Sequence, residues 1–230
     1  MTAAPIAVAL DAPDLTTACQ WAGEVTPTVS TLKIGLESYL RDGHQGVHQV
    51  RQQAADGTAL FLDLKLHDIP NTVAGATRSV ADLVPDFLTV HASGGPAMIE
   101  AAAKAAPQTR ITAVTVLTSL SEADLAAIGL QGPAEEAVTR LASMAVDAGA
   151  RAIVCSPQEV AAVRACVPDD IVLITPGVRP AGSDVGDQQR IATPEQALAA
   201  GANLLVIGRP ITAAPDRAAA AEQIAASLSD

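Results

Sequence analysis

The chain has 230 residues, of which 25 are acidic and 14 basic, giving a net charge of −11 and a pI near 4.6. This charge disfavours nucleic acid as a partner, and the 49% hydrophobic content excludes a disordered or fibrous chain. Aromatic residues make up only 2%, so the core is expected to be aliphatic, and the length suits one α/β barrel or two smaller domains.

Eight short, nearly continuous apolar runs recur along the chain, a pattern typical of parallel strands covered on both faces. They span residues 6–10, 31–35, 59–65, 87–91, 111–117, 152–156, 171–176 and 204–208. Between them lie Ala-rich stretches with helical spacing, among them 71–84, 97–106, 134–148, 194–200 and 216–228. The runs begin about 28 residues apart on average, the size of a βα unit. The pattern predicts a single (β/α)8 TIM barrel over residues 1–230, and the lack of a G-x-G-x-x-G or P-loop motif disfavours an open doubly wound sheet.

Capping residues and loop lengths refine this prediction. Asn71 is expected to cap the helix after Pro70, Thr193 to cap the next-to-last stretch, and Gly149 and Gly201 to end helices. Two connections are unusually long. Residues 118–133 should contain a short extra helix from Ser121, and residues 177–190 form a Gly-rich loop on the face where barrels carry their active sites.

Neither a membrane segment nor a metal site is expected. The first apolar run ends at Asp11 and has no basic region before it, so it is too short for a signal peptide or a membrane span. The cysteines, Cys19, Cys155 and Cys166, have no metal-binding spacing and are expected to be buried in a reducing compartment. We therefore expect a cytoplasmic protein that needs no metal.

Candidate catalytic residues stand at the predicted carboxyl ends of the strands, where barrels place their chemistry. They are Asp11, Lys33, Asp63, Lys65, Thr118, Pro176 and Arg209. The group includes two of the three lysines of the chain, and a lysine at a strand end costs desolvation unless it is paired. This distribution favours a functional site over a chance arrangement.

The most informative segment is residues 61–72. Asp63 and Lys65 are two apart in a predicted strand and so share a face, and Asp68 follows where the chain leaves the strand. With Lys33 on the neighbouring strand they form an array of alternating charge. Opposite charges should keep Lys65 protonated and able to act as an acid; the alternative is a structural ion-pair network, which is more credible for Asp68.

A second segment predicts a phosphate site. The eighth strand ends at Gly208, which permits close approach of backbone to ligand, and Arg209 follows. Arg179 and Gln188 lie on the loop after strand seven, and barrels often bind phosphate with the loops after these two strands. His67 is expected to be structural because it alternates away from Asp63 and Lys65.

These residues together resemble the orotidine 5′-phosphate decarboxylase family in its compact bacterial form. The resemblance is carried, in family order, by the segments at 8–11, 32–35, 63–72, 114–119, 175–179, 186–188 and 208–211. The 63–72 segment, DLKLHDIPNT, is the most specific, whereas GRPI and PGVR are shared with other phosphate-binding barrels.

The resemblance implies a homodimer that converts orotidine 5′-monophosphate to UMP and CO2 without a cofactor. Lys65 would donate the proton within the Lys33, Asp63, Lys65 and Asp68 array. The same resemblance implies the remaining roles. Asp68, Ile69 and Thr72 would enter the site of the other subunit. Asp11 and Lys33 would bind the ribose, Thr118 would bind the pyrimidine, and Pro176 would also lie in the site. The phosphate would be bound by Gln188, Gly208, Arg209 and Arg179.

Two alternatives remain open. Related Mg²⁺-dependent sugar-phosphate decarboxylases or aldolases share the Asp-x-Lys-x-x-Asp segment but carry a metal-binding Glu on strand two, where this chain has Lys33. The second alternative is a barrel that binds a nucleotide without converting it, although a protein that only binds a ligand has no need of such a charged array.

Overall fold

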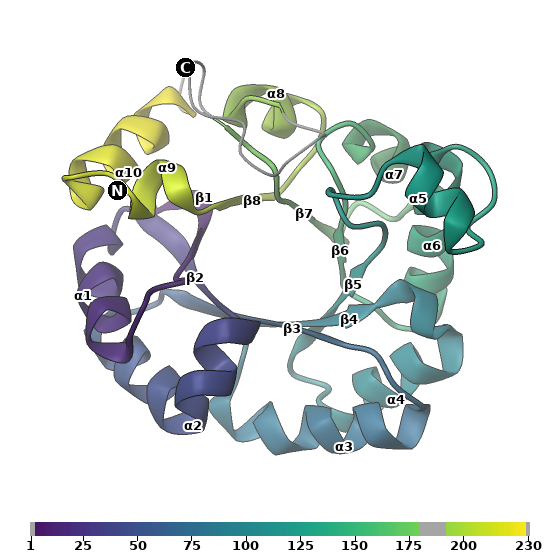
Figure 1. Cartoon of the computed structure of the whole chain (residues 1–230), viewed down its shortest axis with the longest axis horizontal. Coiled ribbons are helices and arrows are strands. Elements are labelled where there is room, and N and C mark those ends of the chain that lie inside the picture. The colour runs from purple at the N-terminus through teal and green to yellow at the C-terminus, as the bar shows by residue number, and fades with distance from the viewer. Residues whose placement is uncertain (1–2, 180–191, 229–230) are drawn as a thin grey trace.

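The computed structural model describes residues 3–179 and 192–228, and its strands close into a parallel barrel (Figure 1). Each strand pairs with the next along the chain, and β8 pairs with β1. The strands are β1 Ala4–Ala9, β2 Val29–Gly35, β3 Ala59–Leu66, β4 Phe87–His91, β5 Arg110–Val114, β6 Ala152–Val154, β7 Val172–Thr175 and β8 Leu204–Ile207. The predicted TIM-barrel fold is confirmed.

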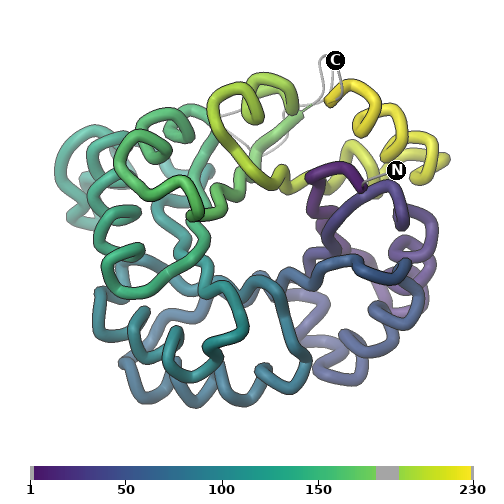
Figure 2. Tube along the Cα trace, turned by 180° about the vertical axis from the view of Figure 1, so that it is seen from behind, coloured from purple at the N-terminus to yellow at the C-terminus, as the bar shows by residue number. Residues whose placement is uncertain are grey.

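Helices surround the barrel, as views from both ends show (Figures 1 and 2). They are α1 Leu15–Val25, α2 Leu36–Gln53, α3 Pro70–Val80, α4 Pro96–Ala105, α5 Glu122–Ala127, α6 Ala134–Asp147, α7 Val160–Cys166, α8 Pro194–Ala199, α9 Arg209–Thr212 and α10 Arg217–Ser227, with short 3-10 turns η1 Ala81–Leu83 and η2 Ala92–Gly94. The extra helix α5 begins after Ser121, whose side chain accepts from the backbone of Asp124 in a capping box. Thr193 caps α8 in the same way, as predicted.

Some predicted boundaries are wrong. Asn71 does not cap α3, because the helix already begins at Pro70, whose fixed φ suits the first helical position, and Ile69 is the N-cap. The fifth strand ends at Val114 rather than at residue 117, because the chain there leaves the sheet toward the barrel mouth. Gly149 and Gly201 do end helices, with φ of +98° and +108° that favour glycine.

The core has two parts, one between barrel and helices and one inside the barrel. The outer part is aliphatic, as predicted. The inner part contains Ala7, Ala152, Ile174 and Leu204 together with both phenylalanines of the chain, Phe61 and Phe87, whose rings meet edge to face at 5.7 Å. The interior of the barrel is therefore a packed core rather than a pore, and any ligand must bind above this inner core.

Two further expectations can be compared with the structure. Cys155 is buried and Cys19 is partly buried, but Cys166 at the end of α7 is exposed, so the expectation of three buried cysteines is met in full by Cys155 alone and is wrong for Cys166. Its position in the last turn of a short surface helix leaves its side chain outside the core.

Within residues 3–179 and 192–228, no helix is long and apolar enough to cross a membrane.

Candidate active site

A cavity of about 260 Å³ opens above the inner core, at the carboxyl ends of the strands. It is lined by Phe61, Asp63, Lys65, Val114, Val116, Leu117, Thr118, Ser119, Val154, Pro176 and Val206. Phe61 belongs to the inner core, so that core forms the floor of the cavity. Four of the predicted site residues, Asp63, Lys65, Thr118 and Pro176, therefore share one cavity.

Asp63 lies between two lysine ammonium groups. Its Oδ1 is 2.7 Å from Lys65 Nζ, and its Oδ2 is 3.2 Å from Lys33 Nζ. The Asp63 side chain is only 13% exposed and that of Lys33 8%, whereas that of Lys65 is 30% exposed toward the cavity. Three members of the predicted array are thus assembled within one chain, and one carboxylate pairs with both ammonium groups.

The electrostatics of this trio keep Asp63 ionised. Burial on its own raises the pKa of Asp63, but the positive charges of Lys33 and Lys65 and their hydrogen bonds outweigh burial, and the net shift is downward. The ionised carboxylate pairs with both ammonium groups. The arrangement can therefore hold an ammonium group at the cavity wall, which is what a general acid requires.

The backbone carries a bulge at this point of β3. Leu62 pairs with Leu88 and Leu66 with Val90, so β3 contains two more residues than β4 between the same pairs. Lys65 lies in the bulge with φ of +47°, a left-handed conformation that costs a residue other than glycine about 1–2 kcal/mol. Simple strand alternation predicted that Asp63 and Lys65 share a face, and the bulge is what aims Lys65 at the Asp63 carboxylate.

Two residues with contacts to the trio were not identified from sequence. Thr89 of β4 hydrogen-bonds both Asp63 Oδ1 and the backbone N–H of Lys65. Gly35 ends β2, and a Cβ built on it would lie 2.9 Å from Asp11 Oδ1 and 3.4 Å from Lys33 Nζ. The sequence did contain a signal for Thr89. It alternates with Phe87 and His91 and therefore shares the inward face of the strand next to β3.

Three of the four predicted phosphate residues, Arg179, Gly208 and Arg209, lie after the ends of β7 and β8. Gly208 follows β8 and lies near Ala9, since a Cβ on Gly208 would be 3.6 Å from that of Ala9. Arg209 begins α9 and is exposed, whereas Arg179 is 9% exposed and donates from Nη1 to the Val178 carbonyl. Gln188 lies outside the described residues.

Asp68, Ile69 and Thr72 are not brought to the trio within this chain. All three are exposed at the start of α3, and Ile69 is 66% exposed despite its apolar side chain. The Asp68 carboxylate accepts from the backbone N–H of Ile69 at 2.6 Å, and it forms no ion pair within the described part of the chain.

Two histidines lie beside the trio. The rings of His67 and His91 are 5.2 Å apart. Burial lowers the pKa of His91, and the charges of His67 and Lys65 lower it further, although Asp63 opposes them. His91 is therefore held neutral near Lys65, and the ring of the exposed His67 lies against it.

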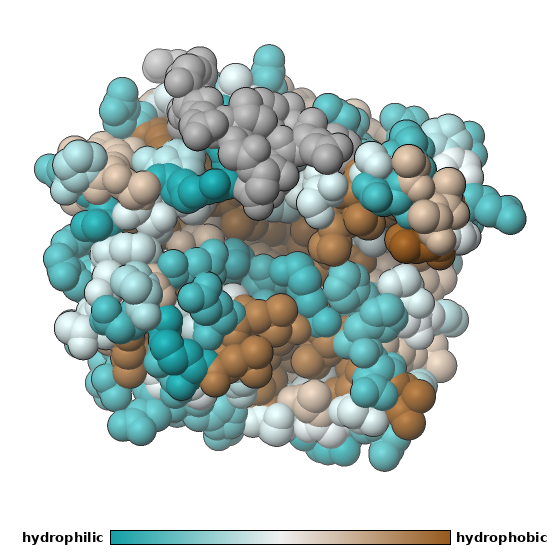
Figure 3. Space-filling model, in the orientation of Figure 1, coloured by the Kyte–Doolittle hydropathy of each residue, from teal (hydrophilic) through white to brown (hydrophobic). Residues whose placement is uncertain are grey.

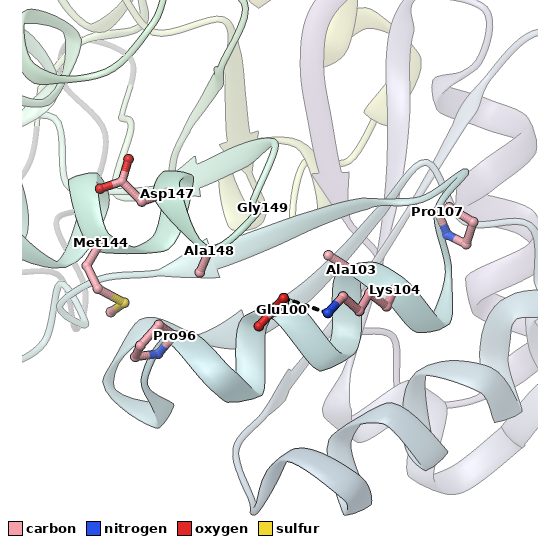
Figure 4. Close-up of a pocket in the computed structure, with 9 residues that line it drawn as sticks. All are labelled: Pro96, Glu100, Ala103, Lys104, Pro107, Met144, Asp147, Ala148 and Gly149. Atoms are coloured by element: carbon pink, nitrogen blue, oxygen red, sulfur yellow. Dashed lines mark hydrogen bonds and ion pairs between the residues drawn. The ribbon is translucent and has the colours of Figure 1, made fainter.

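A larger hollow of about 880 Å³ lies on the outer surface between α4 and α6 (Figure 4). Glu100 and Lys104, which line it, pair with each other at 2.5 Å, and Asp147 adds a negative charge from α6. The hollow is broad and lies away from the strand ends that carry the lysine pair. Of the two sites, the barrel mouth alone offers an ammonium group, that of Lys65, which faces the cavity and is held by a buried carboxylate.

No group of three or more His, Cys, Asp or Glu side chains suited to a metal ion occurs among the residues that the structure describes. At the barrel mouth the Asp63 carboxylate is already engaged by Lys33 and Lys65. A cation there would have to displace one of these ammonium groups.

A closed parallel barrel with a charged cluster at the carboxyl ends of its strands defines the class of TIM-barrel enzymes. The sequence profile of the orotidine 5′-phosphate decarboxylase / HUMPS family matches residues 4–224, and the chain belongs to this family.

Individual relatives are similar to this chain over nearly its whole length. An orotidine 5′-phosphate decarboxylase of Thermobifida fusca is 70% identical over 98% of this chain and 96% of its own length. That of Frankia casuarinae is 58% identical over 98% of this chain and 88% of its own. The crystal structure of the enzyme from Lactobacillus acidophilus superposes with a TM-score of 0.85 at 35% identity, covering 99% of this chain and all of the other.

Proposed function

We propose that this protein catalyses the decarboxylation of orotidine 5′-monophosphate to UMP and CO2, the last step of de novo pyrimidine synthesis. The observation that carries the proposal is the Asp63 carboxylate held between Lys33 and Lys65 beside the cavity at the barrel mouth. The names of the relatives support it. The enzyme acts in the cytoplasm as one barrel that spans residues 1–230.

Lys65 is the proton donor in this mechanism. When the bond from the pyrimidine ring carbon to the carboxylate breaks, CO2 leaves and the electron pair remains on the ring carbon. The Lys65 ammonium stabilises this developing charge and then transfers a proton to the same carbon, giving UMP. Asp63, whose lowered pKa keeps it ionised, lies near the departing carboxylate and pairs with the Lys65 ammonium group at 2.7 Å.

The rest of the substrate is bound by residues around the cavity. Thr118 and Pro176 line it and contact the pyrimidine, and Asp11 and Lys33 bind the ribose hydroxyls. Gly208, Arg209, Arg179 and Gln188 bind the phosphate. Binding energy from this remote phosphate helps to assemble the site around the reacting carbon.

Arg209→Ala should weaken binding of the phosphate in particular. Charge-assisted hydrogen bonds of this kind contribute about 1.5–3 kcal/mol, so the Kd for UMP should rise roughly 10- to 100-fold while the Kd for uridine stays nearly unchanged. Isothermal titration with both ligands measures the difference. Arg140→Ala, which removes an exposed arginine from α6, controls for the change in net charge. Equal losses of UMP and uridine affinity would contradict a phosphate contact.

Gly35→Ala should disturb Asp11 without disturbing the fold. Gly35 has φ of −90°, which alanine adopts readily, but the new Cβ would press on Asp11 Oδ1 at 2.9 Å. We expect KM to rise by roughly threefold to tenfold because a ribose contact shifts, with a Tm within about 3 °C of wild type. Gly23→Ala in α1, where the added Cβ meets only the Gln53 carbonyl at 3.7 Å, is the matched control. An unchanged KM would remove Gly35 from the site.

The active enzyme is a homodimer with shared sites. Asp68, Ile69 and Thr72 are exposed beside the barrel mouth, where a second subunit can receive them. Leu36 and Leu40, on one face of α2, are 46% and 79% exposed, and Figure 3 shows brown, apolar surface over this region. An exposed apolar patch of this kind suits an interface with a second subunit, which would deliver Asp68 to the partner's lysines.

No cofactor takes part, and this distinguishes the proposal from the alternatives. The ultraviolet absorbance of orotidine monophosphate is followed with purified protein, with and without EDTA. Turnover that EDTA leaves unchanged is the expected result. Activity on a ketose phosphate that requires Mg²⁺ would favour the metal-dependent branch, and tight UMP binding without CO2 release would favour a non-catalytic barrel.

A further inference from the structure

The strand next to the bulge faces it with a single residue, Thr89. Three residues of β3, Asp63 to Lys65, span the interval that Thr89 alone occupies on β4. The backbone N–H of Lys65 is out of register with the backbone ladder, and it donates instead to Thr89 Oγ1 at 2.8 Å. A side-chain hydroxyl thus takes the place of a backbone carbonyl at the point where Lys65 adopts its left-handed conformation.

The hydroxyl of Thr89 also has a defined direction. A hydroxyl carries one proton, and because Oγ1 accepts from Lys65, that proton is available to Asp63 Oδ1, 3.1 Å away. The same Oδ1 binds Lys65 Nζ at 2.7 Å. The contacts form a closed ring that runs from the Lys65 backbone through Thr89 and Asp63 to the Lys65 ammonium group. Thr89 is 0% exposed, so water does not compete for its hydroxyl.

We propose that Thr89 is a positioning residue that fixes both the ammonium group of Lys65 and the carboxylate of Asp63 for the proton transfer. The inference rests on the proposed role of Lys65 as proton donor. Thr89 is not among the residues that line the cavity, so it acts through Lys65 and Asp63 rather than on substrate. Without its hydroxyl, the Lys65 backbone loses the bond that maintains φ at +47°. The Asp63 carboxylate then keeps its two lysine partners but loses the third contact that fixes its orientation.

The kinetic test compares Thr89→Val, which keeps the shape and loses the hydroxyl, with Thr89→Ser, which keeps the hydroxyl. Displacing reacting groups by about 1 Å can cost roughly 100-fold, so kcat of Thr89→Val should fall about 10- to 100-fold while KM changes less than about threefold. Thr89→Ser should keep kcat within about threefold.

A neighbouring threonine supplies the matched control. Thr112 pairs with Thr89 in the β4–β5 register, is also 0% exposed, and donates only to the Arg110 carbonyl. Thr112→Val should leave kcat and KM at wild-type values. Should Thr89→Val not fold, Thr89→Ala replaces it in the comparison with Thr89→Ser.

A second measurement does not depend on catalysis. The chain has three lysines, so ¹⁵N-lysine labelling gives three backbone amide signals. Hydrogen exchange of the Lys65 amide should accelerate in Thr89→Val, with Lys33 and Lys104 unchanged. The inference is overturned if Thr89→Val keeps the wild-type kcat, if its KM rises by as large a factor as its kcat falls, or if hydrogen exchange of the Lys65 amide is unaltered. A fully active Lys65→Ala would instead refute the proton-donor role, and the exchange result would still report on the ring of contacts.

Discussion

Lys65→Ala should abolish turnover of orotidine monophosphate. Lys65 Nζ is the ammonium group that both faces the cavity and contacts Asp63, at 2.7 Å. Its loss removes the proton donor, typically worth roughly 10²–10⁴-fold, and also the nearest positive charge to the developing carbanion, so kcat should fall about 10⁴-fold or more. Initial rates from the ultraviolet assay measure this loss.

The controls separate chemistry from folding and binding. Lys104→Ala removes the lysine of α4, whose side chain is 73% exposed and pairs only with Glu100 one helical turn away. Such a surface ion pair contributes little to stability, so the activity of the Lys104→Ala variant should equal that of wild type. UMP should still bind Lys65→Ala, because the phosphate residues are intact. Turnover by Lys65→Ala within about tenfold of wild type would contradict proton transfer from this lysine.

Asp68→Ala should reduce kcat/KM by roughly 10²-fold or more, although Asp68 is exposed and forms no contact with the trio of its own chain. The proposed reason is that this carboxylate completes the charged array of the partner subunit. Asp56→Ala, which removes an exposed carboxylate before β3 at the opposite end of the barrel, should have no effect.

Mixing two inactive variants tests the shared site directly. A hybrid dimer of Lys65→Ala and Asp68→Ala subunits contains one site with neither residue and one site with both. After co-refolding at equal amounts, activity should recover to about one quarter of wild type, because about half of the dimers are hybrids with one working site each. If Asp68 serves its own subunit, no mixture recovers, and the proposal of a shared site fails.

Much of the site was predictable from local sequence. The DLK segment at 63–65 places a carboxylate and an ammonium on one face of a strand, and the structure brings them to 2.7 Å. The eight apolar runs predicted the barrel because burial on both faces leaves a simple signature. The cap at Asn71 was mispredicted because Pro70 competes for the same helix start and begins the helix itself.

The sequence alone determined the fold class and which residue types gather at the barrel mouth, since each signal lies within a short segment. Only the tertiary structure decided how they meet. The barrel register brings Lys33 to Asp63, 30 residues apart, at 3.2 Å, and it sets Thr89 opposite the bulge that holds Lys65. Bulges and cross-strand contacts depend on the alignment of neighbouring strands, which hydrophobic periodicity does not encode.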